Sequence, residues 1–142
     1  DIEGTIRTVS EATRTAVHDN IRRVAEKVAE AHGASAEPEV ILGYPVTSNT
    51  AAFTEFTLDV ANDLLGADRV HRLPNPIMGA EDFSYVLNRV PGTMMFLGGT
   101  PLDRDPRTAA ANHSNLVVFD EAAMPTGIEL YSHMALRHLG AE

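Results

Sequence analysis

The apolar positions of this chain repeat with two different periods, and the change of period separates predicted strands from predicted helices. Residues 2–9 alternate with a period of two and are rich in β-branched side chains, which predicts a strand. From Ser10 to His32 the apolar positions recur at helical spacing, and Gly33 follows as a typical helix stop. A second alternating run over 39–46 completes a β-α-β unit.

The rest of the chain continues the alternation of helical and extended patterns. Residues 47–49 supply good N-cap side chains for a helix over 50–65. A short strand is expected over 70–73, a third helix over 81–90, and a last helix over 120–139. The pattern therefore places helices and strands in turn along most of the sequence.

One extended run differs from the others because it is apolar throughout. Residues 93–97 are typical of a strand covered on both faces, as in a parallel sheet flanked by helices. The order of elements predicts an α/β fold class, with an α+β arrangement in the first part. The apolar stripes expected to face the core are Val17, Ile21, Val24 and Val28, then Phe53, Phe56, Val60 and Leu64, and finally Ile128, Tyr131, Ala135 and Leu139.

The charge balance of the chain is acidic, which excludes some classes of partner. Its 142 residues include 11 Lys and Arg against 20 Asp and Glu, a formal net charge of −9. This balance argues against sequence-independent binding to nucleic acid and against binding to anionic membranes, both of which need a basic face. Cysteine is absent, so no disulfide can form. The apolar runs are too short to cross a bilayer.

The N-terminus lacks the features of a targeting segment. Asp1-Ile2-Glu3 has neither the basic region nor the apolar region of a signal peptide, and the cytoplasm is the simplest compartment. The chain opens without Met and leads directly into a predicted strand. We therefore expect this sequence to be a fragment: a truncated chain, a proteolytic product, or the later part of a longer protein.

Among the six histidines, His113 has the most suggestive position. It ends a long polar loop that follows the buried run 93–97, and binding sites in open α/β sheets gather at the carboxyl ends of strands. Position alone leaves open whether His113 is a ligand or a surface residue. The other histidines are interpreted as surface residues or carry no information: His18, His32, His71, His133 and His138.

Other candidate chemistry is weaker. Glu81 and Asp82 are adjacent, so on a helix they point about 100° apart and cannot form a matched acid–base pair on one face. Their simplest role is to complement the N-terminus of the helix that follows. Gly98-Gly99 lacks the lysine and the helix of a phosphate-binding loop. No cysteine nucleophile or serine nucleophile elbow is present.

Six short motifs nevertheless occur together in one order. They are Gly4-Thr5-Ile6-Arg7-Thr8, Met78-Gly79-Ala80-Glu81-Asp82-Phe83-Ser84, Val90-Pro91-Gly92, Phe96-Leu97-Gly98, His113, and Phe119-Asp120-Glu121. In this combination the sequence resembles the C-terminal part of the metal-dependent amidohydrolase branch of the aminoacylase and carboxypeptidase superfamily of metallopeptidases. That branch includes hippurate hydrolases and auxin–amino-acid conjugate hydrolases.

The resemblance implies a domain organisation. Residues 1–47 are similar to the second half of a lid or dimerisation domain, a strand–helix–strand unit. Residues 48–142 resemble the C-terminal part of an α/β catalytic domain. The resemblance also implies a homodimer formed through the lid, and an N-terminal half of the enzyme that this sequence does not contain.

The resemblance assigns candidate site residues as well. His113 matches the last ligand of a centre with two divalent metal ions, zinc, manganese or similar, whose remaining ligands and general base lie outside this chain. Glu81 is expected close to that centre, either behind the ligands or beside the substrate. Met78 and Gly79 are expected to contact substrate. Arg7 either meets a substrate carboxylate or is a surface residue of the lid.

These assignments imply an enzyme that cleaves the amide bond of N-acyl amino acids or similar small amides through a metal-activated water. The 142 residues alone are expected to be inactive, because one ligand cannot hold two metal ions. The alternative function is a non-catalytic dimerisation or interaction module. A metal titration separates the two interpretations.

Overall fold

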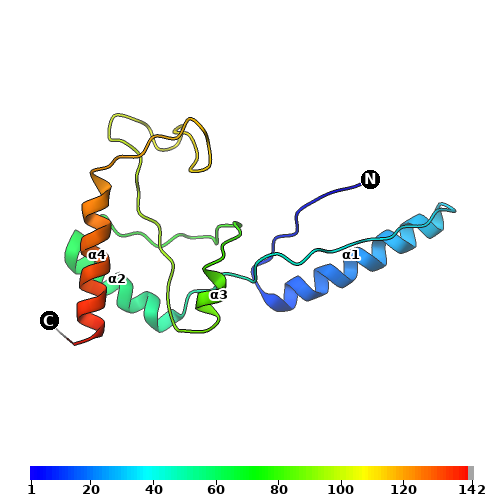
Figure 1. Ribbon diagram of the computed structural model, residues 1–142, viewed down its shortest axis with the longest axis horizontal. Coiled ribbons are helices and arrows are strands. Elements are labelled where there is room, and N and C mark those ends of the chain that lie inside the picture. Colours follow the sequence, from blue (N-terminus) through cyan, green and yellow to red (C-terminus); the bar gives the residue numbers. More distant parts are fainter. Residues whose placement is uncertain (141–142) are drawn as a thin grey trace. The chain divides into compact units, whose positions relative to one another are not determined.

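The computed structural model describes residues 1–140, which form helices joined by long extended segments (Figure 1). The helices are α1 (Glu11–Ala31), α2 (Ala51–Leu65), α3 (Ser84–Leu87) and α4 (Ala123–His138). None of them combines the length and the apolar character that a bilayer crossing requires. The sequence correctly predicted α1, α2 and α4, with bounds that differ from the expected ones by up to three residues at each end.

The predicted fold class, with its β-α-β unit, is wrong for this structure. Residues 1–140 contain no β-strand, although 2–9, 39–46 and 93–97 are extended. A period of two requires only an extended chain with one apolar side, whereas a strand also needs a neighbouring segment at ladder distance. Within the described chain, no backbone-to-backbone hydrogen bond joins 2–9 or 39–46 to another segment.

Contact clustering divides the chain into two compact units. Unit 1 comprises Asp1–Thr50 and Arg72–Thr93, and unit 2 comprises Ala51–His71 and the chain from Met94 onward. The predicted domain boundary between residues 47 and 48 concerns a longer protein and stays a prediction.

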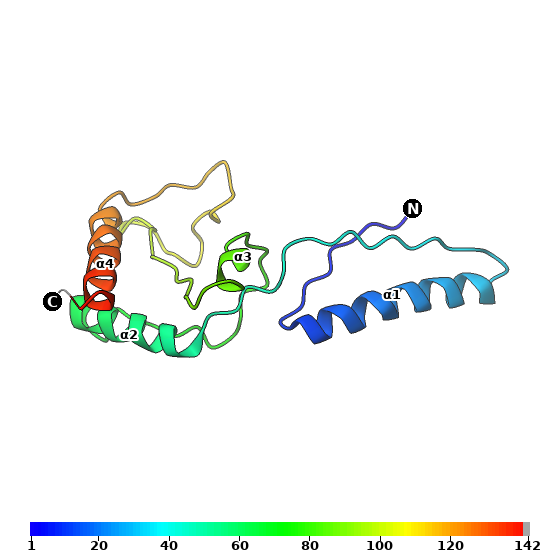
Figure 2. The same ribbon diagram turned by 60° about the horizontal axis from the view of Figure 1, so that its bottom comes forward.

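In unit 1, helix α1 has the ends that the sequence predicts. The side chain of Ser10 accepts a hydrogen bond from the Thr13 amide at 3.1 Å, and so caps the N-terminus. After the helix, Gly33 adopts a φ of 70°, a conformation that glycine tolerates best. The return segment 34–47 runs back along α1 (Figure 2).

The less exposed side of α1 differs in part from the predicted one. No α1 residue is buried, and the apolar Val24 and Val28 are 49% and 54% exposed. The least exposed positions include Arg14, His18 and Arg22, which share one face at a spacing of four. Of the predicted stripe, Val17 is therefore partly buried, and Ile21, Val24 and Val28 are exposed.

In unit 2, α2 and α4 pack against each other and enclose a small core (Figure 2). Val60 and Ala61 of α2 are 1% and 2% exposed, and Leu130 of α4 is 8% exposed. Partly buried hydrophobic residues complete this core: Phe56, Leu64, Val70 and Met134. The predicted α2 stripe is thus confirmed at Phe56, Val60 and Leu64.

The predicted face of α4 is wrong. Ile128 and Tyr131 are 67% and 78% exposed, while Leu130 and Met134 face α2. Apolar residues occur on more than one side of α4, so the position of its packing partner decides which side is buried. Gly127 allows the close approach of Leu97, whose Cδ2 would lie 3.2 Å from a Cβ at this position.

We expect Leu130→Ala to destabilise unit 2 by about 2–4 kcal/mol, because it removes a buried side chain from a small core and leaves a cavity. Urea unfolding followed by circular dichroism measures the loss. Ile128→Ala is the matched control, since Ile128 is 67% exposed on the same helix. An equal effect of both substitutions would contradict the observed packing of α4.

Candidate functional site

Three of the residues assigned to substrate binding lie together in unit 1. The Nη1 of Arg7 donates a hydrogen bond of 2.7 Å to the backbone oxygen of Met78, across 71 residues of sequence. Gly79 follows Met78 directly. The structure therefore brings the first motif of the chain to the second one.

The local backbone does not require a glycine at position 79. A Cβ at this position would meet only Ile77 Cγ2 at 3.9 Å, an ordinary van der Waals distance. Its φ is not positive, unlike that of Gly33 or Gly66. Nothing in the described part of the chain therefore opposes a larger residue at position 79.

Glu81 organises the turn that begins α3. Its Oε1 accepts a hydrogen bond from the Phe83 amide at 3.3 Å. Its backbone oxygen accepts from the Ser84 hydroxyl at 2.6 Å, and Ser84 is fully buried. The helix here is shorter than the predicted 81–90. Before it, the Ser84 and Tyr85 amides bond oxygens three residues back, and after it three-residue and four-residue bonds are mixed.

The motif Val90-Pro91-Gly92 ends at a reciprocal contact with Thr50. The Thr50 amide donates to the Gly92 oxygen at 2.9 Å, and the Gly92 amide donates to Thr50 Oγ1 at 3.3 Å. Gly92 is tightly enclosed, since a Cβ there would lie 3.0 Å from Leu87 Cδ2. In the same unit, Tyr44 and Tyr85 meet edge to face with ring centroids 5.9 Å apart. The two sequence segments of unit 1 are therefore joined at several points.

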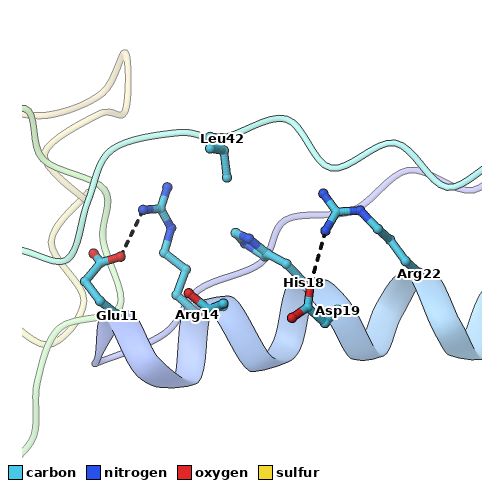
Figure 3. A pocket seen from close by; sticks show the side chains of 7 residues that line it. Glu11, Arg14, His18, Asp19, Arg22 and Leu42 are labelled. Atoms are coloured by element: carbon cyan, nitrogen blue, oxygen red, sulfur yellow. Dashed lines mark hydrogen bonds and ion pairs between the residues drawn. The ribbon is translucent and has the colours of Figure 1, made fainter.

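A groove of about 290 Å³ lies between α1 and the return segment (Figure 3). Glu11 Oε1 accepts a hydrogen bond from the Val46 amide at 2.7 Å, and Glu11 Oε2 pairs with Arg14 Nη1 at 3.1 Å. Arg14 Nη2 donates to the Gly43 oxygen at 3.0 Å. These contacts, which sequence analysis missed, fasten residues 43–46 to the first turn of α1. The Val46 amide, followed by Arg14, lowers the pKa of Glu11.

The lowered pKa of Glu11 predicts a pH-dependent contribution to stability. Its folded-state pKa lies below the ordinary value of 4.5, so the contribution is present above that value and is lost as the pH falls through the folded-state pKa. Glu11→Gln should cost about 0.5 kcal/mol at neutral pH, because the pair is exposed, and little at low pH. Urea unfolding at both pH values tests this, with Glu37→Gln as the control. A pH-independent loss would contradict the account.

In unit 2, His113 is exposed on a loop whose two ends are joined by a hydrogen bond. The Asp120 amide donates to the Gly99 oxygen at 2.8 Å, so the first and last residues of the loop 99–120 lie next to each other. The Ser114 amide bonds the Ala111 oxygen at 2.8 Å, which places His113 inside a turn. The structure therefore places His113 on an exposed loop, and its role as a metal ligand stays a prediction. Glu81 belongs to unit 1, and its predicted proximity stays a prediction.

The same loop contains an ion pair that the sequence analysis did not identify. Asp105 accepts from Arg107 Nε at 3.0 Å and from Arg107 Nη2 at 2.8 Å, while the Arg107 amide donates to Asp105 Oδ1 at 2.9 Å. Hydrogen bonding from the Arg107 side chain lowers the pKa of Asp105, and the same contact raises the pKa of Arg107. The pair shapes a turn before His113.

The described residues do not form a metal site by themselves. Residues 1–140 contain no group of three or more His, Asp or Glu side chains placed to hold a metal ion. A single exposed imidazole supplies one of the three or four ligands that a zinc-type ion needs. We therefore derive no catalytic step through a metal ion from this chain alone.

Comparison with known proteins places these features in a family. Residues 3–137 match the sequence profile of Peptidase family M20/M25/M40. The chain is 30% identical over 142 residues to the IAA-amino acid hydrolase ILR1-like 4 of Arabidopsis thaliana, covering 97% of this chain and 32% of that protein. It is 29% identical over 136 residues to the N-acetylcysteine deacetylase of Bacillus subtilis, covering 96% and 33%.

A solved structure agrees with the sequence matches. The YXEP protein of Bacillus subtilis, described as a dinuclear metal-binding peptidase of the M20 family, superposes with a TM-score of 0.74 at 28% identity. The match covers 95% of this chain and 35% of that one, so the chain spans about a third of the length of its relatives. Because the family profile extends over nearly the whole sequence, the chain belongs to Peptidase family M20/M25/M40.

Proposed function

We propose that these residues work as the C-terminal third of a metal-dependent amidohydrolase that cleaves N-acyl amino acids or similar small amides. The observation that carries this proposal is the match of residues 3–137 to one peptidase family, with relatives named as an IAA-amino acid hydrolase and an N-acetylcysteine deacetylase. The longer enzyme is this chain together with the N-terminal part that the proposal requires.

In the longer enzyme, His113 supplies one ligand of a two-metal centre, and the other ligands come from outside this chain. Two divalent ions, zinc, manganese or similar, supply an activated water and polarise the amide when bound. The loop closed by Gly99 and Asp120 holds the His113 imidazole at an exposed position. An exposed ring is free to enter a site that another part of the protein completes.

Substrate contacts are proposed to come from unit 1. Arg7 uses Nη1 for the Met78 oxygen, and its other guanidinium N–H groups have no partner within the described chain. Those groups suit a substrate carboxylate, which a guanidinium binds through paired hydrogen bonds. Met78 and Gly79 would contact the substrate beside Arg7. Glu81, whose carboxylate holds the Phe83 amide, positions this loop.

A second candidate function, a dimerisation module, is favoured by the exposed apolar residues of the α1 stripe. Val24 and Val28 are about half exposed, and no α1 residue is buried. Burying such a stripe in a homodimer through residues 1–47 is compatible with the enzymatic proposal. Titration of the longer protein with zinc and manganese distinguishes the enzyme from a pure dimerisation module. A pure dimerisation module would bind neither ion tightly.

The enzymatic proposal is tested by assaying the longer enzyme on a panel of N-acyl amino acids with added manganese or zinc. We expect hydrolysis that a chelator abolishes and that metal restores. Hydrolysis that persists after metal removal would refute metal dependence. A protein that binds both metals tightly but leaves every amide intact would refute the proposed reaction.

Gly79→Ala tests the substrate contact. Because a Cβ at position 79 has room in the structure, the free energy of unfolding should change by less than about 0.5 kcal/mol. A substrate that lies against Gly79 would collide with the new methyl group, so KM should rise about tenfold with little change in metal content. Gly43→Ala is the control, since a Cβ there has room as well and meets nothing within 4 Å. An unchanged KM would remove Gly79 from the substrate site.

A further inference from the structure

The loop that carries Met78 and Gly79 has one attachment to the rest of unit 1. Within residues 73–80, the hydrogen bond from Arg7 Nη1 to the Met78 oxygen is the single one that the structure contains. The segment has no helix or strand, and all its residues from Leu73 to Ala80 are exposed. Arg7, which is distant in sequence, is therefore the one hydrogen-bonding partner of this segment among the described residues.

The contact is short, and its donor is charged. At 2.7 Å it is at the short end for a hydrogen bond from a charged nitrogen, and such bonds are stronger than neutral ones. Arg7 reaches the loop from the extended segment before α1, whose start is fixed by the Ser10 cap. Arg7 therefore links the exposed loop to a segment that ends, three residues later, at the capped start of α1.

We propose that Arg7 is a positioning residue that holds the Met78–Ala80 loop in one conformation, apart from any contact that Arg7 makes with a substrate carboxylate. The consequence for catalysis rests on the proposed function, because it requires Met78 and Gly79 to contact substrate. The structural part of the proposal does not depend on that function. Without Arg7 the loop would sample several conformations, and substrate binding would then require one of them to be selected.

The structural part is tested in the longer enzyme by NMR relaxation, with ¹⁵N introduced only into glycine and alanine. In the unmodified enzyme, we expect the Gly79 and Ala80 amides to have order parameters near 0.8, the range of a rigid backbone. Arg7→Met should lower them below about 0.6, and Arg7→Lys should restore most of the difference because an ammonium group can donate to the same oxygen. Arg104→Met is the control, an exposed arginine of unit 2. Equal order parameters in all variants would overturn the proposal.

A second measurement covers the case in which Arg7→Met does not fold. With ¹⁵N in the Arg7 guanidinium and ¹³C in the Met78 carbonyl of the unmodified longer enzyme, a scalar coupling across the hydrogen bond should be detected. An assigned, slowly exchanging Arg7 Nη1 group without that coupling would overturn the proposal without any substitution.

The catalytic consequence is tested in the longer enzyme with two substrates, an N-acyl amino acid and the same compound with its carboxylate blocked as an amide. Loop positioning predicts that Arg7→Met raises KM about tenfold for both substrates at nearly constant kcat, and that Arg7→Lys recovers most of the loss. A change confined to the free carboxylate substrate would overturn the positioning role. If the longer enzyme hydrolyses no amide, the proposed function fails, and the relaxation experiment still decides whether Arg7 holds the loop.

Discussion

Replacing His113 by alanine should remove essentially all amide hydrolysis from the longer enzyme while leaving its fold intact. Loss of a metal ligand removes water activation, and we expect kcat to fall by at least about a thousandfold. His113 is exposed on a loop, so the free energy of unfolding should change by less than about 0.5 kcal/mol. Bound metal per chain, measured by elemental analysis after gel filtration, should fall in parallel with activity.

His71→Ala is the matched control for this experiment, because His71 is also exposed and no role is assigned to it. It should retain both activity and metal. Activity near the unmodified level in His113→Ala would rule out the ligand role. A loss of activity accompanied by a large loss of stability would instead point to a structural role for the His113 turn.

The 142-residue chain without the rest of the enzyme should associate with itself and hydrolyse no amide. Many large apolar side chains are exposed in both units, among them Ile2, Leu102, Tyr131 and Leu139, which are between 76% and 101% exposed. Apolar surface of this extent promotes association, as do extended segments with unpaired backbone groups. Light scattering should report dimers or larger species at micromolar concentration.

Metal titration and an amidase assay complete this second prediction. Isothermal titration with zinc or manganese should show no tight binding, because the described residues offer no cluster of three ligands. A stable monomer with metal-dependent amidase activity would show that the active site lies within this chain. That outcome would contradict both the proposed division of the enzyme and the assignment of His113.

Local signals in the sequence predicted the helices well. Ser10 and Gly33 mark the ends of α1 through a cap and a positive φ, which depend on neighbouring residues only. The strands were wrong because alternation at 2–9 and 39–46 describes a chain conformation and not its partner. The buried face of α4 was wrong for a related reason, since Leu130 and Ile128 are equally apolar and only the position of α2 distinguishes them.

The site was predictable where motifs identify residues, and not where distant segments meet. The motifs singled out Arg7 and Met78, but their hydrogen bond spans 71 residues and no local pattern predicts it. The contact of Glu11 with the Val46 amide is equally non-local. The Asp105–Arg107 pair is local, and an acid followed two residues later by arginine across a proline was a signal that could have been used.

The most direct test of the central claim fuses this chain behind the N-terminal two thirds of the Bacillus subtilis YXEP protein, in place of the third that it matches. Hydrolysis of N-acyl amino acids is then compared for the fusion, its His113→Ala variant and the truncated YXEP segment alone. The account predicts chelator-sensitive hydrolysis by the fusion, and none by the other two. A folded, metal-loaded fusion that hydrolyses no amide, or a His113→Ala fusion as active as the unmodified one, would contradict it.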